Sequence, residues 1–229
     1  LMPFQVRSLT AAHIDNLSVA QIPAIDPTDI AAMRPAEQIS ALKSAQVGAL
    51  LSSQIKALAP TQIREITPPA IPGFSREQIQ NLSAAQVGAL KPAQLAAMNF
   101  AQIGALTPMQ VKGMASTQLQ EEQVSQLSPE MISALTPVQL GGLTPRQFDS
   151  LSDTQVAGLT PTQIAGLAPS VIGNLSDTQF AAMGAEGLNK LNSKQLAALT
   201  SKQIAAIRQE EISGLSETMV TKFATKQLQ

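Results

Sequence analysis

Hydrophobic residues recur along this chain with a period of eight. Residues 143 to 166 read LTPRQFDS, LSDTQVAG and LTPTQIAG, and the same order runs through almost all of the 229 residues. Numbered from its leucine, each octad has Leu, Ile, Met or Phe at position 1 and mostly Ile, Val or Leu at position 6. Position 5 is usually Gln, and positions 7 and 8 are mostly Ala, Gly or Ser. A fixed short period of this kind indicates a repeat architecture.

Positions 1 to 6 of the octad carry the signals of a helix start. Ser or Thr at position 2 with Gln at position 5 is a capping box, in which each side chain accepts a hydrogen bond from the other residue's amide. Proline is favoured at position 3, the first helical residue, because its missing N–H would be unpaired anyway. The apolar residues at positions 1 and 6 have the spacing of a hydrophobic staple. The prolines at position 3 are Pro3, Pro27, Pro35, Pro60, Pro68, Pro92, Pro108, Pro129, Pro137, Pro145, Pro161 and Pro169.

These signals predict one short helix in each octad. A recurring proline prevents one continuous helix, so we expect each helix to span about five or six residues and to end before the next octad. Helices this short are unstable alone, and their stability has to come from stacking. Small residues at positions 7 and 8 let successive helices pack closely. The sequence therefore predicts an all-α solenoid, a superhelical rod over residues 1–229 whose axis is filled with Leu and Ile.

The period is interrupted at three places. One extra residue lies between Ile30 and Ile39, which predicts a minor bulge. Residues 66–74, ITPPAIPGF, lack the Gln and add prolines and a glycine, which predicts an irregular joint. Residues 118–124 are short of the period and predict a second joint. We interpret these interruptions as repeat decay, with a binding site at a bend as the alternative.

Composition excludes several classes of function. The chain has no Cys and one His, so disulfides, Cys/His metal sites and a Cys/His dyad are absent. Charged residues make up 14% and the net charge is −1, which predicts a neutral polar surface and argues against nucleic-acid binding. No apolar run approaches the roughly 18 residues of a membrane span. The chain begins with Leu1 and shows no signal peptide, so we expect a fragment or a processed product.

Few residues could carry chemistry. Asp26 with Asp29, and Glu121 with Glu122, are the candidate carboxylate pairs. Asp26 falls at the helix-capping position, and Asp29 and His13 take the place of the capping-box Gln, so we interpret all three as helix-start residues. We expect no catalytic residue, no metal ligand and no cofactor, and therefore no enzymatic activity.

Two positions of the octad define possible recognition surfaces. The Gln at position 5 is interpreted as a local cap, with bonding between repeats as an addition and an amide ladder along the rod as the alternative. Position 4 is the most variable and is predicted to face solvent, so any specificity would lie there and at position 2. The position-4 residues considered are Glu37, Glu77, Met109, Glu130, Arg146, Thr162, Lys194, Lys202 and Lys226.

The units LTPTQIAG, LTSKQIAA, LSAAQVGA and LSDTQVAG resemble the Leu-Thr-Thr-Ala-Gln-Val-Ala-Ala octapeptide arrays of large bacterial secreted and cell-surface proteins. The resemblance covers nearly the whole chain and implies an exported spacer, stalk or interaction region. LTPTQIAGL is also similar to the opening helix of transcription-activator-like effector repeats. Those units are several times longer, and eight residues leave no room for their base-reading loop, so we attribute this second likeness to a shared capping box.

We therefore expect a structural segment, acting as spacer, stalk or fibre-forming scaffold of a bacterial surface or secreted protein. A protein-binding solenoid module is the alternative. Neither end of the sequence resembles a capping repeat, and apolar faces are expected to be uncovered at residues 1–9 and 223–228. From this we expect either a longer array or head-to-tail self-association, because an exposed solenoid end needs cover.

Overall fold

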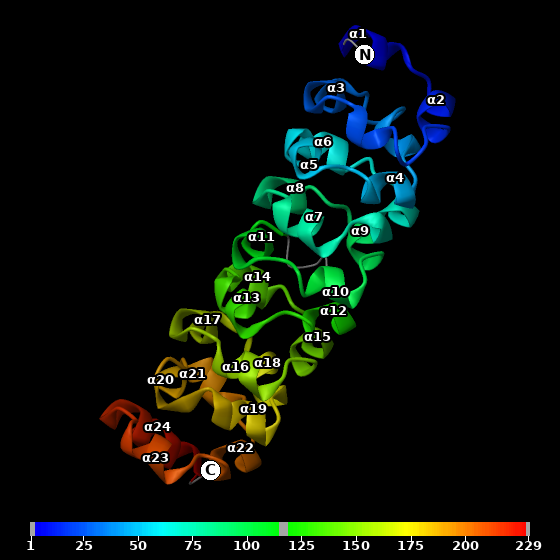
Figure 1. Ribbon diagram of the computed structural model, residues 1–229. Coiled ribbons are helices and arrows are strands. Elements are labelled where there is room, and N and C mark those ends of the chain that lie inside the picture. Colours follow the sequence, from blue (N-terminus) through cyan, green and yellow to red (C-terminus); the bar gives the residue numbers. More distant parts are fainter. Residues whose placement is uncertain (1–2, 115–118, 228–229) are drawn as a thin grey trace. The chain divides into compact units, whose positions relative to one another are not determined.

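Every regular element of the described structure is a helix. The computed structural model describes residues 3–114 and 119–227, and within these ranges the prediction of an all-α repeat fold is confirmed. The chain divides into two compact units, Leu1–Leu119 and Gln120–Gln229, and each is a stack of short helices (Figure 1). The division falls within the second joint expected from the sequence. A single solenoid spanning both units stays a prediction.

The helices of each unit follow the octads in order. The first unit contains α1 (Pro3–Ser8), α2 (Ala11–Asp15), η1 (Ile22–Ala24), α3 (Pro27–Ala32), η2 (Ile39–Ala41), α4 (Ser44–Gly48), α5 (Ser52–Ala57), α6 (Pro60–Ile63), η3 (Pro68–Gly73), α7 (Arg76–Asn81), α8 (Ala84–Gly88), α9 (Pro92–Ala96), α10 (Phe100–Ile103) and α11 (Pro108–Lys112). The second contains α12 (Glu121–Val124), α13 (Pro129–Ala134), α14 (Pro137–Gly141), α15 (Pro145–Asp149), α16 (Asp153–Ala157), α17 (Pro161–Gly166), α18 (Pro169–Asn174), α19 (Asp177–Ala182), α20 (Gly184–Leu188), α21 (Ser193–Ala197), α22 (Ser201–Ala205), α23 (Gln209–Ser213) and α24 (Glu217–Gln227).

Helix α7 shows how an octad starts and stops a helix. Ser75 precedes it in an extended conformation, and its hydroxyl accepts from the amide of Gln78 at 3.1 Å. The Gln78 side chain accepts from the Ser75 amide at 2.8 Å, which completes the predicted capping box. At the other end, Leu82 is extended, with φ −65° and ψ 138°, so the helix cannot continue. Ile79 and Leu82 are both buried, as the pattern of apolar positions predicts.

In the described part of the chain, three octads form 3₁₀ helices instead of α-helices. In η1 and η3, Pro23 and Pro72 lack the amide that an α-helical bond needs at those places. Helix η2 follows the extra residue near 34–38, where the amide of Ile39 bonds to the carbonyl of Arg34 at 3.2 Å. Pro35 lies in this turn, so its prediction as a first helical residue is wrong.

The last helix departs from the predicted length. Helix α24 spans 11 residues, where a break was expected at Phe223. The next two residues are Ala224 and Thr225, so position 2 offers no capping hydroxyl and position 3 no proline. Without either signal the helix runs through the octad boundary.

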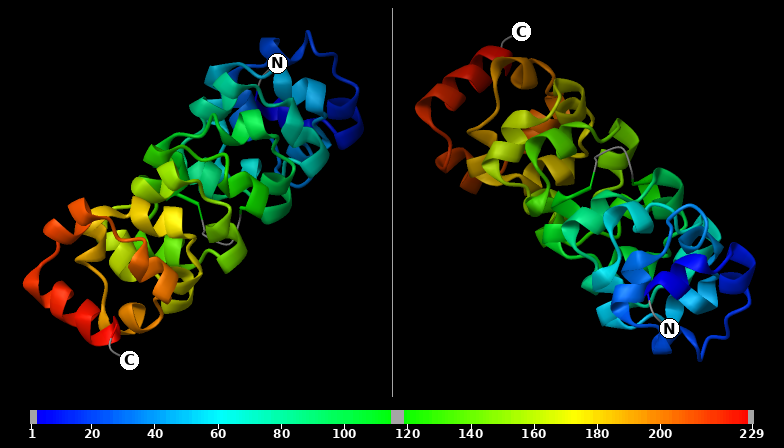
Figure 2. Two further views of the ribbon diagram at one scale, coloured as in Figure 1. Left: turned by 90° about the horizontal axis from the view of Figure 1, so that it is seen from below. Right: turned by 90° about the horizontal axis from the view of Figure 1, so that it is seen from above.

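Helices that pack together are three octads apart. Helix α8 packs against α11, α14 against α17 and α16 against α19, and Figure 2 shows the helices of each unit placed around its axis. The expectation that successive helices pack on one another is therefore wrong. The chain passes through intervening octads before it returns to the same side, and the small residues at positions 7 and 8 face that returning helix.

The glycines show how close this contact is. A Cβ on Gly113 would lie 2.6 Å from the carbonyl oxygen of Ala84, which begins the helix three octads earlier. A Cβ on Gly173 would lie 2.7 Å from the carbonyl oxygen of Ala198, and one on Gly141 would lie 3.6 Å from that of Gly166. The first two separations are below any real Cβ contact, whereas the third is ordinary van der Waals contact.

The octad period is shortened before Leu119, and not within residues 118–124 as expected. Leu119 occupies position 1 of a regular octad, with Gln120 as the cap residue and Gln123 as the capping-box side chain. The next position-1 residue, Leu127, follows eight residues after Leu119, so residues 119–126 form a complete octad. The missing residues therefore fall between Met114 and Leu119, where 115–118 lie outside the described residues.

The two glycines give a matched test of this packing. We expect Gly173→Ala to lower the free energy of unfolding by about 1–3 kcal/mol, the usual cost of overpacking. Gly141→Ala occupies the same octad position and has room for a methyl group, so it should be neutral or slightly stabilising because alanine favours helix. Urea unfolding followed by circular dichroism measures both. Equal stability changes for the two variants would contradict the packing described.

Candidate functional site

The glutamine at position 5 joins two turns of the solenoid. Gln94 is fully buried, and its Oε1 accepts a hydrogen bond from the Lys91 amide at 2.7 Å. Its Nε2 donates to the carbonyl oxygens of Ile63 at 2.8 Å and Ile66 at 2.6 Å. One side chain therefore closes the start of its own helix and holds the backbone of an earlier turn.

The same arrangement recurs in both units. The Nε2 of each of these glutamines donates to two carbonyls at sites equivalent to Ile63 and Ile66: Gln38, Gln46, Gln54, Gln62, Gln78, Gln86, Gln94, Gln102, Gln110, Gln155, Gln163, Gln195 and Gln203. Gln179 donates to one carbonyl, that of Leu151, at 2.7 Å. We call the hydrogen bonds from a position-5 Nε2 to the carbonyls of an earlier turn the glutamine bridge.

The bridge defines the size of a superhelical turn. The octad of Gln94 begins at Leu90. Its two acceptors lie at the end of the helix that starts four octads earlier, at Ile63, and at the first residue of the octad three octads earlier, Ile66. A turn therefore contains between three and four octads.

The extra residue near 34–38 is visible in the bridge register. From Gln78 onward the acceptors lie 31 and 28 residues earlier in the two-carbonyl bridges. For Gln38, Gln46, Gln54 and Gln62 the separations are 32 and 29, because these bridges span the nine-residue unit. The spatial contact is preserved and the inserted residue is accommodated locally in a turn.

Local capping and bonding between repeats are thus both confirmed for the glutamine column. The amide ladder is wrong for these bridges, since each Nε2 donates to backbone carbonyls and not to another glutamine. A capping box needs only an acceptor, and Glu would serve as well as Gln. The preference for Gln over Glu was the signal in the sequence that the second, donating end is used.

Octads without the glutamine show what replaces it. His13 keeps the local contact, with its Nδ1 3.1 Å from the Thr10 amide, and it is exposed. Glu211 accepts from the Arg208 amide at 2.9 Å and from the Arg208 guanidinium at 2.8 Å. The hydrogen bond and the charge of Glu211 raise the pKa of that guanidinium. The helix-start interpretation of His13 is confirmed.

Asp26 and Asp29 differ in their hydrogen bonds: the Asp26 carboxylate has partners, and the Oδ1 of Asp29 has none. Asp26 accepts from the hydroxyl and the amide of Thr28 at 2.6 and 2.8 Å, which lowers the pKa of Asp26 and confirms it as a cap. Because folding lowers this pKa, the cap stabilises above the ordinary aspartate range, and the stabilisation is lost as pH falls through the lowered pKa. Asp29 is 1% exposed, and its Oδ1 has no hydrogen-bond partner. Its interpretation as a capping-box replacement is wrong, because its side chain is one methylene shorter than Glu or Gln.

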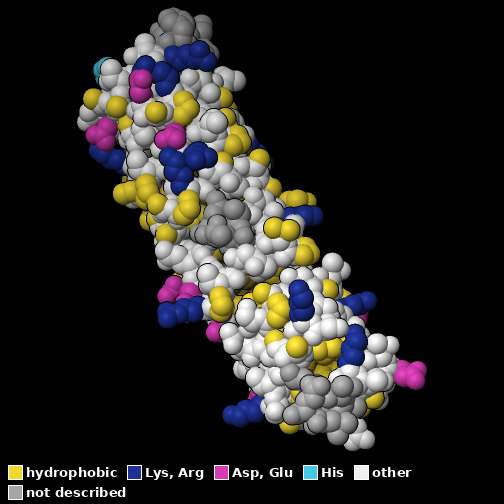
Figure 3. Space-filling model, turned by 180° about the vertical axis from the view of Figure 1, so that it is seen from behind, with side chains coloured by type: hydrophobic (Ala, Val, Ile, Leu, Met, Phe, Trp, Pro, Cys, Tyr) yellow, Lys and Arg dark blue, Asp and Glu magenta, His cyan; other side chains and the backbone are white. Residues whose placement is uncertain are grey.

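The other candidate carboxylates and the position-4 stripe face solvent. Glu121 and Glu122 are both exposed. Among the described residues there is no group of three or more His, Cys, Asp or Glu side chains placed to hold a metal ion. The prediction that position 4 is exposed is confirmed where it is described, with Met109 69% and Val138 84% exposed. Lys226 has no described side chain. In the face drawn in Figure 3, charges of both signs are scattered among neutral atoms.

The apolar ends are less exposed than expected. Val6 is 1% exposed and Phe223 is 6% exposed, so the expectation of uncovered faces at these residues is wrong. Val6 is covered by the turn that follows, where Gln38 also bonds to its carbonyl at 2.6 Å. Leu9 is half-buried, and Leu1, Met2 and Leu228 lie outside the described residues.

Comparison with known proteins adds a family resemblance. Residues 22–60 match the model of a family described as the ALTTAQ repeat. The match covers α3, α4, α5 and the 3₁₀ helices η1 and η2, so part of this chain is similar to a repeat family. No curated protein matches the chain. In the described residues, none of the helices combines the length and the apolar character needed to cross a membrane.

Removal of one bridge should cost more than removal of any exposed glutamine. We expect Gln94→Met, which keeps the length of the side chain, to lower the free energy of unfolding by about 2–5 kcal/mol. The Lys91 amide and the buried Ile66 carbonyl lose their partner, and the buried Ile63 carbonyl keeps only its bond from the Ile66 amide. Gln80→Met is the control, since Gln80 is exposed in the same unit. Chemical unfolding followed by circular dichroism measures both variants. A loss below about 0.5 kcal/mol for Gln94→Met would show that the bridge does not stabilise the stack.

Proposed function

We propose that this chain is a structural spacer or scaffold and has no enzymatic activity. The observation that carries the proposal is the glutamine bridge, which repeats in both units and contacts backbone carbonyls. Backbone acceptors are present whatever residue occupies the exposed positions. The stack can therefore be extended octad by octad without a dedicated ligand or catalytic group.

The exposed stripe favours a spacer over a binding module. Position 4 carries acidic, basic, apolar and neutral side chains in turn, such as Glu77, Met109, Arg146 and Thr162. A recognition surface needs a shared pocket or a field of one sign, because binding energy concentrates in a few clustered residues. The stripe offers neither along its length.

We also propose a place on the surface of a bacterium or in its secretions. The support is the resemblance of the octads to secreted octapeptide arrays and the agreement between the family description and the octad. The letters ALTTAQ follow the order of positions 8, 1, 2, 3, 4 and 5. The absence of Cys from the sequence suits an array of any length, since no disulfide is needed between turns.

Head-to-tail association of two copies is the proposed route to a fibre. In the first turn, Gln21 uses its Oε1 to accept from the Ser18 amide at 2.8 Å, while no hydrogen bond from its Nε2 is found among the described residues. A turn supplied by a second copy would place carbonyls within reach of that Nε2, as in every bridged turn. Such a contact is heterologous and can propagate.

Sedimentation velocity tests this association. We expect the full chain to show an average mass that rises with concentration, and Gln21→Met to weaken the rise. Gln80→Met, an exposed glutamine away from the first turn, should leave it unchanged. A monomer at every concentration would contradict head-to-tail association and would leave the spacer proposal to the mechanical test below.

A spacer has to carry load along its length. Held by its two ends in optical tweezers, the chain is expected to unfold in several steps of a few octads each and to refold on relaxation, because each turn depends mainly on its neighbours. Gln94→Met should lower the force of the weakest step.

Two results would contradict the spacer proposal. One is rupture of the whole chain in a single irreversible step. The other is saturable binding of a purified protein that is lost when the exposed residues at position 4 are replaced by Ser, which would favour the protein-binding module.

A further inference from the structure

Three consecutive octads of the second unit have almost no glutamine bridge to the turn before them. They span residues 167–190 and contain α18, α19 and α20 (Figure 1). Their position-5 residues are Val171, Gln179 and Gly187. Gln179 bonds to one carbonyl, that of Leu151, at 2.7 Å. In the described part of the chain, no other side-chain hydrogen bond and no ion pair joins residues 167–190 to residues 137–166. We call residues 167–190 the seam.

Apolar packing takes the place of the missing bridges. At the separations of 31 and 28 residues seen in bridged octads, the acceptors for a glutamine at 171 would be the carbonyls of Leu140 and Leu143, two buried residues. The valine side chain has no donor for them. At Gly187, a Cβ would lie 2.5 Å from the Cδ1 of Ile164, so the Ile164 side chain occupies the space next to this position.

The helices of the seam also lack caps. Helix α18 follows Ala168, which forms no side-chain capping bond, and α20 follows Met183, which forms none either. Helix α20 starts at Gly184, whose φ of 63° favours glycine. Of the three helices, α19 alone has a capping box. Since a short helix without a cap or a bridge depends on its neighbours, the seam is held more weakly than a bridged turn.

Other octads without a bridging glutamine are held in other ways. Ala70 lies between the bridged octads of Gln62 and Gln78, so one bridge is missing there and not three in succession. In the last octads, Asn189 accepts from the Ser216 amide at 2.8 Å, where Met219 cannot form a capping box.

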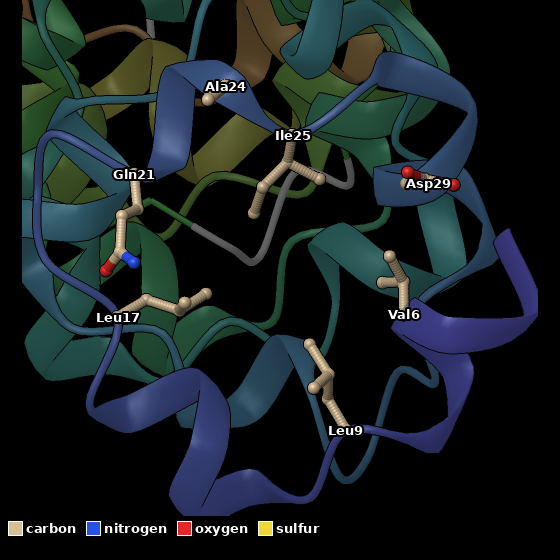
Figure 4. A pocket seen from close by; sticks show the side chains of 7 residues that line it. All are labelled: Val6, Leu9, Leu17, Gln21, Ala24, Ile25 and Asp29. Carbon is tan, nitrogen blue, oxygen red and sulfur yellow. The ribbon is translucent and has the colours of Figure 1, made fainter. Parts of the chain in front are cut away.

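The first turn of the first unit is a different case. Figure 4 shows Gln21 beside a hollow lined by Leu9, Leu17 and Ile25. The described structure contains no earlier turn to which Gln21 could bond. The seam, in contrast, lies between two described turns.

We propose that the second unit opens reversibly along the seam while the turns on either side stay bridged. Gln163 holds the earlier side, with bonds of 2.9 and 2.7 Å to the turn before it. Gln195 bonds to Ile164 and Leu167 at 2.9 and 2.8 Å, which fixes the corner where the seam begins. Opening at the seam breaks fewer hydrogen bonds than opening at a bridged turn, so it occurs first.

The role of this opening rests on the proposed spacer function, since a spacer that opens along one line lengthens before its turns unfold. The opening itself is a property of the chain without load. Its absence would leave the spacer to the mechanical test, and failure of the spacer in that test would leave the opening measurable.

Hydrogen exchange of the full chain under native conditions, followed by NMR, tests the seam. The backbone amides of Ile172 and Phe180 lie in the seam, and those of Val156 and Leu196 lie at the same position of bridged octads. Each donates to the carbonyl of its own cap residue, at 3.2, 2.9, 3.0 and 2.9 Å respectively. We expect Ile172 and Phe180 to exchange at least about ten-fold faster than the other two, because they are released when the seam opens.

Val171→Gln supplies the missing bridge. We expect it to slow the exchange of both Ile172 and Phe180 by about ten-fold, the effect of one or two added hydrogen bonds. Phe180 is the decisive reporter, because it lies in the next octad and has its own capping box, so a cap added to α18 alone would not slow it. Ser170→Gln places the same side chain at an exposed neighbouring position and should leave both rates unchanged.

The outcomes are distinct. Equal exchange of the four amides in the unsubstituted chain would overturn the proposal, as would faster exchange at Leu196 than at Ile172, which would show fraying from the end. Slowing by Val171→Gln at Ile172 alone would show local fraying of α18 and would overturn it as well. If circular dichroism shows that Val171→Gln does not fold, the comparison within the unsubstituted chain decides.

Discussion

The fold depends on a side chain that forms hydrogen bonds at both ends. A helix of five residues cannot exist alone in water, and each octad buries only two large apolar side chains. The position-5 glutamine connects such a helix to the rest of the molecule, because its oxygen accepts from the start of its own helix and its nitrogen donates to an earlier turn. Without Gln94, the buried carbonyl of Ile66 would lack a hydrogen bond, and the part-buried amide of Lys91 would lose its partner.

Other features of the octad follow from this bridge. The donating amide has to reach the same corner of the preceding turn each time, which keeps the turn between three and four octads. The helix that returns alongside is close enough that Gly113 has no room for a side chain next to Ala84. An extra residue is tolerated near 34–38. It lengthens the sequence separation between a glutamine and its acceptor from 31 to 32 residues, and the hydrogen bond is still formed. At the bridge position of α3, the buried Oδ1 of Asp29 has no hydrogen-bond partner.

The sequence predicted the local structure well and the packing poorly. Capping boxes such as Ser75 with Gln78 involve residues three apart, so residue types alone identify them. Packing of α8 on α11 depends on how far the chain direction rotates between successive octads, and this rotation cannot be predicted from the residue types. The unpartnered Asp29 and the buried Phe223 were also missed, because both depend on neighbours from other turns. The use of Gln where Glu would suffice as a cap was the one available sign of the bridge.

Hydrogen exchange of the glutamine side-chain amides tests the bridge most directly. NMR can follow the Nε2 protons of Gln54, Gln86 and Gln94 after transfer into deuterated water, with the exposed Gln80 as the internal reference. The account predicts that the bridging Nε2 protons are protected as strongly as the buried backbone amides of the same turns, because both exchange only when the stack opens. Exchange of the bridging amides at the rate of Gln80 would show that the bridges do not hold the turns together.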